Sequence, residues 1–159
     1  MKIDSTDHAI LEALQERARI SNVELADRVH LSESACLRRV RALEEAGVIA
    51  GYSAMVDPVR VGLPSAVFVQ LTLQRQDQTD LDAFEEAVQN IPEVMECYLM
   101  TGEFDYLLRI VVPDLAAYER FLMEHLTRID GIASIKSSFS LKQVQYKTAL
   151  PLTAKDSKR

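Results

Sequence analysis

The spacing of apolar residues changes character at one short segment, and this change constrains the fold more than any other feature. Over about the first 47 residues, apolar side chains recur as in amphipathic helices; after the segment, strand-like alternation and helical spacing follow one another. The segment itself, residues 57–64 (DPVRVGLP), contains two prolines and one glycine, which interrupt regular structure. The sequence therefore predicts a first domain over residues 1–54, a linker over 55–64, a second domain over 65–150 and a tail over 151–159.

The first domain is predicted to contain three short helices. Apolar residues over 5–16 share one helical face, and Ser21 begins a capping box that starts a second helix of about two turns. Ser32 is the expected N-cap of the third helix, and Gly47 follows its last periodic residue. A β-like pattern then covers residues 48–55. Three helices with a tight turn between the last two are typical of a helix-turn-helix domain.

The second domain is predicted to alternate strands and helices in the order β, α, β, β, α, β. This order is that of the ferredoxin-like sandwich, in which two helices cover one face of a four-stranded antiparallel sheet. The uncovered face would expose apolar side chains, so we expect a subunit interface over it. The predicted fold class is therefore α+β, with strands at residues 66–73, 94–100, 106–112 and 132–141 and helices at 81–91 and 115–129.

Composition excludes several classes of protein. The chain has 159 residues, no apolar run of the roughly 18 that a membrane-spanning helix needs, and no signal-peptide layout at its start. Cys36 and Cys97 are too few for a disulfide scaffold and are not clustered as zinc ligands. We therefore expect a cytoplasmic protein without a membrane partner. The net charge of −6 would by itself predict no nucleic-acid partner, so any DNA-binding surface must be locally basic.

A locally basic surface is present on the third predicted helix. Ser34, Arg38 and Arg41 are spaced i, i+4, i+7 and form one stripe, with Arg39 beside it. Arginines can pair with guanine edges or phosphates, and a serine hydroxyl near a helix N-terminus can hold a phosphate. The alternative is a solvated face, because three nearby glutamates would repel phosphate. If the stripe binds DNA, few contacts per domain imply that several copies bind together.

A second candidate site is the turn at residues 101–105. Gly102 lets the backbone approach a ligand, and neighbouring N–H groups could take a carboxylate. Glu103 or Asp105 could take an ammonium group, so the turn could bind both ends of an amino acid. The alternative is a plain hairpin turn with solvated acids.

No catalytic constellation is predicted. His8, His30 and His125 lie on three separate predicted elements, without partners at metal or triad spacing. Neither cysteine has an activating neighbour in sequence. We therefore expect no enzyme activity, no metal site and no cofactor other than a small effector.

Three motifs together resemble one family. The strings LSxSxCLRRVRxLExxGVI, TGEFDYL and SSFSLKQVQYKTALPL are similar to those of the Lrp/AsnC, or feast/famine, transcription factors over nearly the whole chain. Where the family string usually has proline, this chain has Glu33 and Ala35, so a carboxylate replaces a neutral residue at the helix start. The stretches PEVMECYLMTG and KTALPL look like regulators of branched-chain keto acid dehydrogenase operons, which suggests a branched-chain amino acid as effector.

The resemblance implies a DNA-binding helix-turn-helix domain and a C-terminal domain that dimerises through its sheets. In the family, dimers assemble into octamers, and amino-acid effectors bind between dimers near the TGEFDY turn. Carried onto this sequence, the DNA-binding residues are Asn22, Ser32, Ser34, Arg38, Arg39 and Arg41. The effector-binding residues are Met100, Thr101, Gly102, Glu103, Phe104, Asp105, Tyr106, Leu115, Ser138, Phe139 and Ser140.

The expected function is therefore sequence-specific regulation of transcription in amino-acid metabolism, in the cytoplasm of a bacterium or archaeon and associated with the nucleoid. Double-stranded DNA, an amino acid and further copies of the chain are the expected partners. One alternative is an architectural DNA-organising protein that ignores small molecules. A second is an enzyme or enzyme-regulating subunit with an amino-acid-binding βαββαβ domain, which only the second domain would favour.

Overall fold

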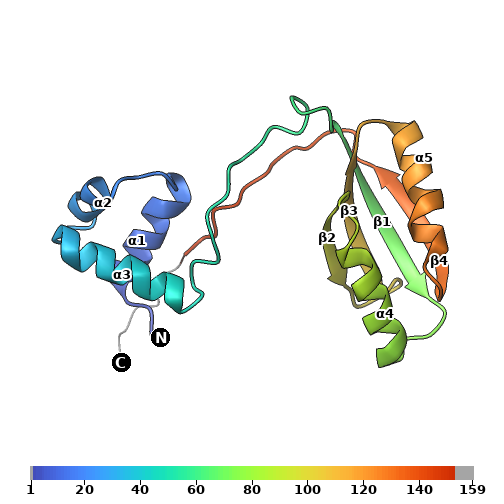
Figure 1. Ribbon diagram of the computed structural model, residues 1–159, viewed down its shortest axis with the longest axis horizontal. Helices are drawn as coiled ribbons and strands as arrows, with labels where there is room; N and C mark the ends of the chain where they lie inside the picture. Colours follow the sequence, from blue (N-terminus) through green and yellow to red (C-terminus); the bar gives the residue numbers. More distant parts are fainter. Residues whose placement is uncertain (1, 153–159) are drawn as a thin grey trace. The chain divides into compact units, whose positions relative to one another are not determined.

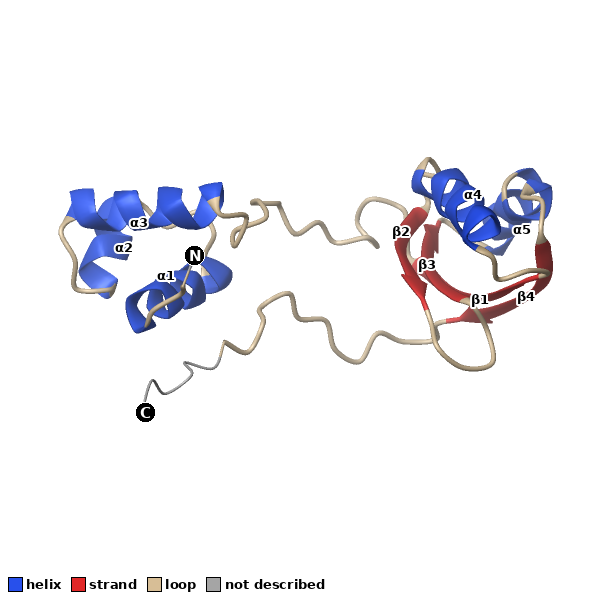
Figure 2. Ribbon diagram, turned by 90° about the horizontal axis from the view of Figure 1, so that it is seen from below, coloured by secondary structure: helices blue, strands red, loops and turns tan. Residues whose placement is uncertain are grey.

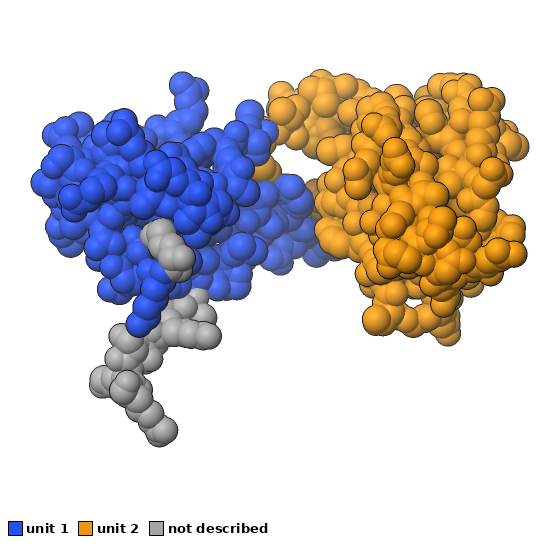
Figure 3. Space-filling model, turned by 60° about the horizontal axis from the view of Figure 1, so that its bottom comes forward, with its two compact units in different colours: residues 1–54, 144–159 blue, residues 55–143 orange. Residues whose placement is uncertain are grey.

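The computed structural model describes residues 2–152, which form two compact units (Figure 3). One unit contains residues 2–54 together with 144–152, and the other contains residues 55–143. The boundary near residue 55 lies where the prolines and glycine of the linker begin. At the other end the division differs from the sequence-based boundary at residue 150, because residues 144–152 group with the N-terminal helices. The predicted polar tail lies largely outside the described residues.

The N-terminal unit is a three-helix domain whose helices are α1 (Ser5–Glu16), α2 (Asn22–Arg28) and α3 (Glu33–Glu45) (Figure 1). Side chains cap all three at their N-termini: those of Asp4, Ser21 and Ser32 each accept a hydrogen bond from a backbone N–H three residues on. Gly47, with φ +68°, follows the end of α3 in the left-handed conformation that favours glycine. The buried core consists of Ile10, Ala13, Leu25, Ala26, Cys36 and Leu43.

The β-like pattern after α3 was a wrong prediction, because residues 48–55 contain no strand. A strand is stable only when its N–H and C=O groups pair with a neighbouring strand. Here the backbone bonds of Val48 and Ile49 run back to Leu43, which ends α3 rather than starting a sheet. Alternating apolar residues were therefore insufficient evidence for a strand.

The C-terminal unit has the predicted ferredoxin-like βαββαβ fold and confirms the α+β class. Its four strands form one antiparallel sheet in the order β2-β3-β1-β4. Both helices lie on the same face of this sheet (Figures 1 and 2). The elements in chain order are β1 (Ser65–Leu73), α4 (Gln78–Gln89), β2 (Val94–Leu99), β3 (Tyr106–Val112), α5 (Leu115–Glu124) and β4 (Ile132–Phe139).

The second helix of this unit is shorter than its sequence pattern predicted. Helical spacing extended to Ile129, but α5 ends at Glu124 and a 3₁₀ turn follows over Leu126–Arg128. Leu126 is fully buried in the core, and Ile129 packs against that core from outside the helix. The tighter turn thus still delivers apolar side chains to the core, which explains why helical periodicity overestimated the helix.

The two faces of the sheet differ in exposure. On β1, Val67, Val69 and Leu71 are fully buried beneath the helices. On the opposite face, Phe68 is 39% exposed and Tyr98 is 51% exposed. The uncovered face therefore presents aromatic side chains, as the strand alternation predicted.

No helix among residues 2–152 is both long and apolar enough to cross a membrane.

Candidate DNA-binding surface and effector loop

The outer side of α3 carries an open hollow of about 350 Å³. Arg38 and Arg41 are exposed there and form no ion pair within residues 2–152. An arginine without a partner keeps all its N–H donors available for a ligand. The hollow is lined by Ser34, Leu37, Arg38, Arg41, Ala42 and Glu45. The structure thus brings together the three residues of the predicted basic stripe.

The other polar residues expected at the DNA surface hold the start of α3. The Ser32 hydroxyl accepts the Ala35 N–H at 3.3 Å and lies 3.3 Å from the Ser34 hydroxyl. The Asn22 side-chain amide donates to the Glu33 carbonyl at 3.0 Å and so ties α2 to α3. Asn22 and Ser32 already have structural partners, whereas Ser34 also faces the hollow.

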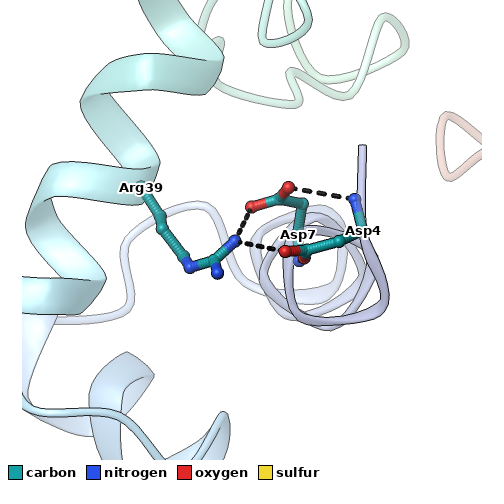
Figure 4. A network of polar contacts seen from close by, with 3 residues as sticks. All are labelled: Asp4, Asp7 and Arg39. Atoms are coloured by element: carbon teal, nitrogen blue, oxygen red, sulfur yellow. Dashed lines mark hydrogen bonds and ion pairs between the residues drawn. The ribbon is translucent and has the colours of Figure 1, made fainter. Parts of the chain in front are cut away.

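Arg39 differs from its neighbours because it points to α1 rather than into the hollow (Figure 4). Its Nη1 lies 2.8 Å from Asp4 Oδ2 and 2.8 Å from Asp7 Oδ1. The positive charge of Arg39 is therefore paired with two carboxylates at the start of α1. Arg39 was predicted among the DNA-binding residues, since helical spacing places it beside the stripe but does not show what it contacts.

The glutamates of α3 that would repel phosphate are not equivalent. Glu44 accepts a hydrogen bond from the Tyr52 hydroxyl at 2.9 Å. Burial, and then this carboxylate, raise the pKa of Tyr52 to about 12. Glu45 lies in the hollow itself, and Glu33 lies in the first turn of the helix. Two acids therefore remain near the predicted DNA contacts.

The predicted effector loop, residues 100–105, joins β2 to β3 and is fixed to the sheet by its backbone. The Met100 N–H donates to the Asp105 carbonyl at 2.7 Å, and the Asp105 N–H donates to the Leu71 carbonyl at 2.8 Å. Gly102 has φ +125°, a conformation that residues with a side chain rarely adopt. The tip, including Thr101 and Glu103, is exposed.

The carboxylate of Asp105 holds this loop through hydrogen bonds and is not free to bind a ligand. Its carboxylate accepts the Leu73 N–H at 2.7 Å and the Gln76 side-chain amide at 2.7 Å, and the residue is only 9% exposed. From the sequence, either Glu103 or Asp105 could be the partner of an ammonium group. Of the two, Glu103 has the exposed carboxylate.

Tyr106 faces the helices. Its ring packs against Phe84 at a centroid distance of 4.4 Å, and its hydroxyl donates to Glu85 at 2.8 Å. Burial, then the Glu85 hydrogen bond, hold its pKa well above the usual range. Tyr106 and Glu85 border an open hollow of about 340 Å³ between α4 and β2, which also contains Cys97. Nothing in the sequence indicated Glu85. Its hydrogen bond with Tyr106 depends on how α4 packs on β3, which only the structure shows.

The remaining predicted effector residues do not lie beside the loop within one chain. Along β1, Tyr106 pairs with Leu71, whereas Phe139 pairs with Val67. Four residues of a strand separate these pairs, about 13 Å. Ser138, Ser140 and Leu115 lie at the same far end as Phe139, because β3 runs from the loop toward α5. The structure thus divides the predicted effector residues into a loop group and a far-end group.

The candidates for other chemistry stay dispersed. Among the residues that the structure describes, no three His, Cys, Asp or Glu side chains come together as metal ligands. His8 lies on α1, His30 follows α2, and His125 follows α5. Cys36 is buried in the N-terminal core, and burial raises the pKa of its thiol.

One interaction across the chain had no sequence signal. The Gln15 side chain on α1 donates to the Leu150 carbonyl at 3.2 Å and accepts the Leu150 N–H at 2.6 Å. A glutamine amide can mimic a strand backbone in this way, but residues 135 positions apart show no periodicity that would predict it.

Comparison with protein families gives a match for each unit. Residues 3–50 match a family described as winged helix-turn-helix DNA-binding. Residues 66–150 match the Lrp/AsnC ligand binding domain. The first match includes the α3 surface, and the second includes the sheet and the loop at residues 100–105.

Relatives and solved structures cover nearly the whole chain. The Bkd operon transcriptional regulator of Pseudomonas aeruginosa is 47% identical, over 95% of this chain and 99% of its own. The leucine-responsive regulatory protein of Escherichia coli K12 is 42% identical, over 93% of this chain and 90% of its own. A crystal structure of a Neisseria meningitidis transcriptional regulator in complex with L-Met has a TM-score of 0.89 at 39% identity, covering 94% of this chain and 97% of that one.

Proposed function

The chain belongs to the Lrp/AsnC family of transcriptional regulators, and from this premise we propose how its residues bind DNA and effector. The protein is a DNA-binding regulator of transcription with an amino-acid-binding domain, and it is not an enzyme. Because its target is DNA, we place it in the cytoplasm in contact with the nucleoid.

We propose that α3 enters the major groove with Ser34, Arg38 and Arg41 toward the DNA. The observation that carries this proposal is the outer hollow, where both arginines are exposed without an ion pair in residues 2–152. Arginine can bind guanine through two hydrogen bonds or neutralise a phosphate. Asn22 and Ser32 support the start of the helix through the contacts described above.

The test is DNA binding of the full chain measured by fluorescence anisotropy over a range of salt. Arg38→Ala and Arg41→Ala should each weaken binding, and each lost phosphate contact should lower the slope of log K against log salt by about 0.9. Arg120→Ala, on the exposed side of α5, removes the same charge and should change neither quantity. If Arg38→Ala and Arg41→Ala bind like Arg120→Ala, the assignment of α3 is wrong.

We propose that the effector site is composite, with the loop group of one copy opposite the far-end group of another. The roughly 13 Å separation of these groups along β1 supports this, because one amino acid cannot contact both within a single chain. The loop offers backbone N–H groups for a carboxylate and Glu103 for an ammonium. Leu115 and Phe139, 66% and 40% exposed, offer apolar surface for a side chain.

The proposed effector is a branched-chain or similarly apolar amino acid. The apolar character of Leu115 and Phe139 supports this choice. Two relatives point the same way, since one is named leucine-responsive and one was crystallised with L-Met. No cofactor is part of the proposal.

The composite site requires an oligomer. We propose a dimer through the uncovered sheet face, where Phe68 and Tyr98 would become buried, and a further association of dimers up to an octamer. Binding to one arrangement of dimers would then shift assembly and DNA affinity together.

This proposal is tested by light scattering with each of the twenty amino acids, beside DNA binding under the same conditions. We expect leucine, isoleucine, valine or methionine to change both the mass of the assembly and the DNA affinity. A large assembly that binds DNA and responds to none of the twenty would favour the architectural alternative.

A further inference from the structure

Arg39 is the centre of a contact between α3 and the start of α1 that the DNA-binding surface does not include. Asp4 and Asp7 form the capping box of α1: the Asp7 N–H donates to Asp4 Oδ1 at 2.8 Å, and the Asp4 N–H donates to Asp7 Oδ2 at 3.1 Å. The other oxygen of each carboxylate accepts from Arg39 Nη1 at 2.8 Å. All four carboxylate oxygens are therefore occupied (Figure 4).

The buried carboxylate of Asp7 makes this cluster costly to break. Asp7 is 2% exposed, and the Arg39 side chain is 34% exposed. Without Arg39, the buried Asp7 carboxylate would lose its charged partner, which is unfavourable, whereas the Asp4 side chain is 50% exposed and can be solvated. The pKa of Asp4 lies below its ordinary value because the Asp7 N–H, and then Arg39, favour its charged form. The contact therefore holds α3 at a defined position against α1.

The charge of the cluster argues against a direct contact with DNA. Two carboxylates and one guanidinium leave a net negative charge, which repels phosphate. Arg39 also lies on the side of α3 that faces α1, whereas Arg38 and Arg41 line the outer hollow. With 100° of rotation per residue, adjacent arginines on one helix serve different surfaces.

We propose that Arg39, Asp4 and Asp7 are positioning residues that set the orientation of α3 in the major groove, so that Arg38 and Arg41 meet the correct base pairs. This inference rests on the proposed function of α3. The helix has 13 residues and a length of about 20 Å, so a tilt of about 5° displaces one end by nearly 2 Å. Such a displacement is sufficient to break a bidentate hydrogen bond to a base.

Positioning and simple electrostatics predict different effects of Asp7→Asn on DNA binding. Asp7→Asn removes a negative charge from the DNA-binding unit, so charge alone would raise affinity for any duplex. Positioning predicts instead that Asp7→Asn loses discrimination between duplexes. Glu12→Gln removes the same charge from an exposed position on the same helix and is the matched control.

Arg39 variants separate positioning from a phosphate contact. Both of its bonds come from the single atom Nη1, so one lysine ammonium can replace them. Arg39→Lys should therefore retain most discrimination, and Arg39→Gln should lose it. A phosphate contact would appear as a salt slope lowered by about 0.9 in Arg39→Gln, with no effect of Asp7→Asn.

The experiment measures binding of the full chain to a duplex selected by the wild-type protein from a random pool, and to its scrambled sequence. We expect Asp7→Asn and Arg39→Gln to lower the ratio of affinities for the selected and scrambled duplexes by about tenfold or more. This is the loss expected when one bidentate contact to a base is broken, and the salt slope should stay unchanged. If Asp7→Asn fails to fold, as judged by circular dichroism, Asp4→Asn replaces it, because asparagine remains a good N-cap.

Two outcomes overturn different statements. If Arg38→Ala weakens binding but Asp7→Asn, or Asp4→Asn in its place, behaves like Glu12→Gln, the positioning role is refuted. If Arg38→Ala itself has no effect on affinity or ratio, the proposed DNA-binding face of α3 is wrong.

Discussion

Because the Asp105 carboxylate accepts two hydrogen bonds, we expect Asp105→Ala to destabilise the C-terminal unit. The substitution removes two hydrogen bonds to a carboxylate, from the Leu73 N–H and the Gln76 amide, both at 2.7 Å. Leu73 is 5% exposed, so its N–H would remain buried without a partner. Such a donor costs about 1–3 kcal/mol, and the exposed Gln76 amide can bind water instead. We expect the free energy of unfolding of the C-terminal unit to fall by roughly 1–3 kcal/mol.

Two matched variants define the cause. Asp105→Asn keeps one carbonyl oxygen that can accept the Leu73 N–H, so its loss should be smaller, about 1 kcal/mol. Glu103→Ala removes an exposed acid from the same loop and should leave stability within about 0.5 kcal/mol of the wild type. The order of stability should therefore be Glu103→Ala, then Asp105→Asn, then Asp105→Ala.

The assay is urea unfolding at a fixed protein concentration, since association of subunits adds to apparent stability. Hydrogen exchange of the Leu73 amide reports the same bond directly and should accelerate in Asp105→Ala. The reasoning is refuted if Asp105→Ala unfolds within about 0.5 kcal/mol of the wild type and the Leu73 amide stays protected.

Two further predictions follow from the ionisable groups. Desolvation, and then the Glu85 carboxylate, raise the pKa of Cys97 to about 11. At pH 8 its thiolate is then about 100-fold scarcer than that of a thiol of pKa 9, but roughly tenfold more nucleophilic. Iodoacetamide should therefore modify Cys97 about tenfold more slowly, as peptide mass spectrometry would show. A rate at pH 8 equal to that of a free thiol would contradict this. The Arg109 hydrogen bond lowers the pKa of Glu96 in the folded protein. As the pH falls, the unfolded chain therefore binds this proton before the folded chain does. The stabilisation from the Glu96–Arg109 pair should be lost progressively below about pH 5. Urea midpoints from pH 7 to 3 should therefore fall less steeply in Glu96→Gln than in the wild type.

The local parts of the fold could be predicted from sequence because their signals lie within a few neighbouring residues. The caps at Ser21 and Ser32, and the buried alternation of β1, are of this kind. The β-like pattern of residues 48–55 failed because a strand depends on a partner that alternation does not reveal.

The sites were predictable only as lists of residues. Helical spacing correctly placed Ser34, Arg38 and Arg41 together, but the partners of Arg39 lie 32 and 35 positions away. The acids of α1 were explained as helix-dipole residues, and nothing in one sequence shows that they also bind α3. For Asp105, the residue type suggested a ligand for an ammonium, whereas the register of the sheet gives it backbone partners.

The division of the effector residues into two groups leads to a test that needs no structure of a complex. Gly102→Val strains the loop at φ +125°, and Leu115→Arg places a charge at the far end, so either should abolish binding of leucine in a uniform oligomer. A site built within one chain stays defective when the two variants are mixed. A site between copies becomes intact wherever the loop of a Leu115→Arg subunit meets the far end of a Gly102→Val subunit.

Random mixing should restore about a quarter of such composite sites, since each half is intact with even odds in a closed homo-oligomer. Coexpression of the two variants followed by calorimetric titration with leucine measures that fraction, and each variant alone is the control. Recovery near a quarter requires that neighbouring copies complete each other's site, and it ties effector binding to assembly. No recovery, in oligomers shown by mass spectrometry to contain both variants, would place the site within one chain and remove the physical link between effector and association.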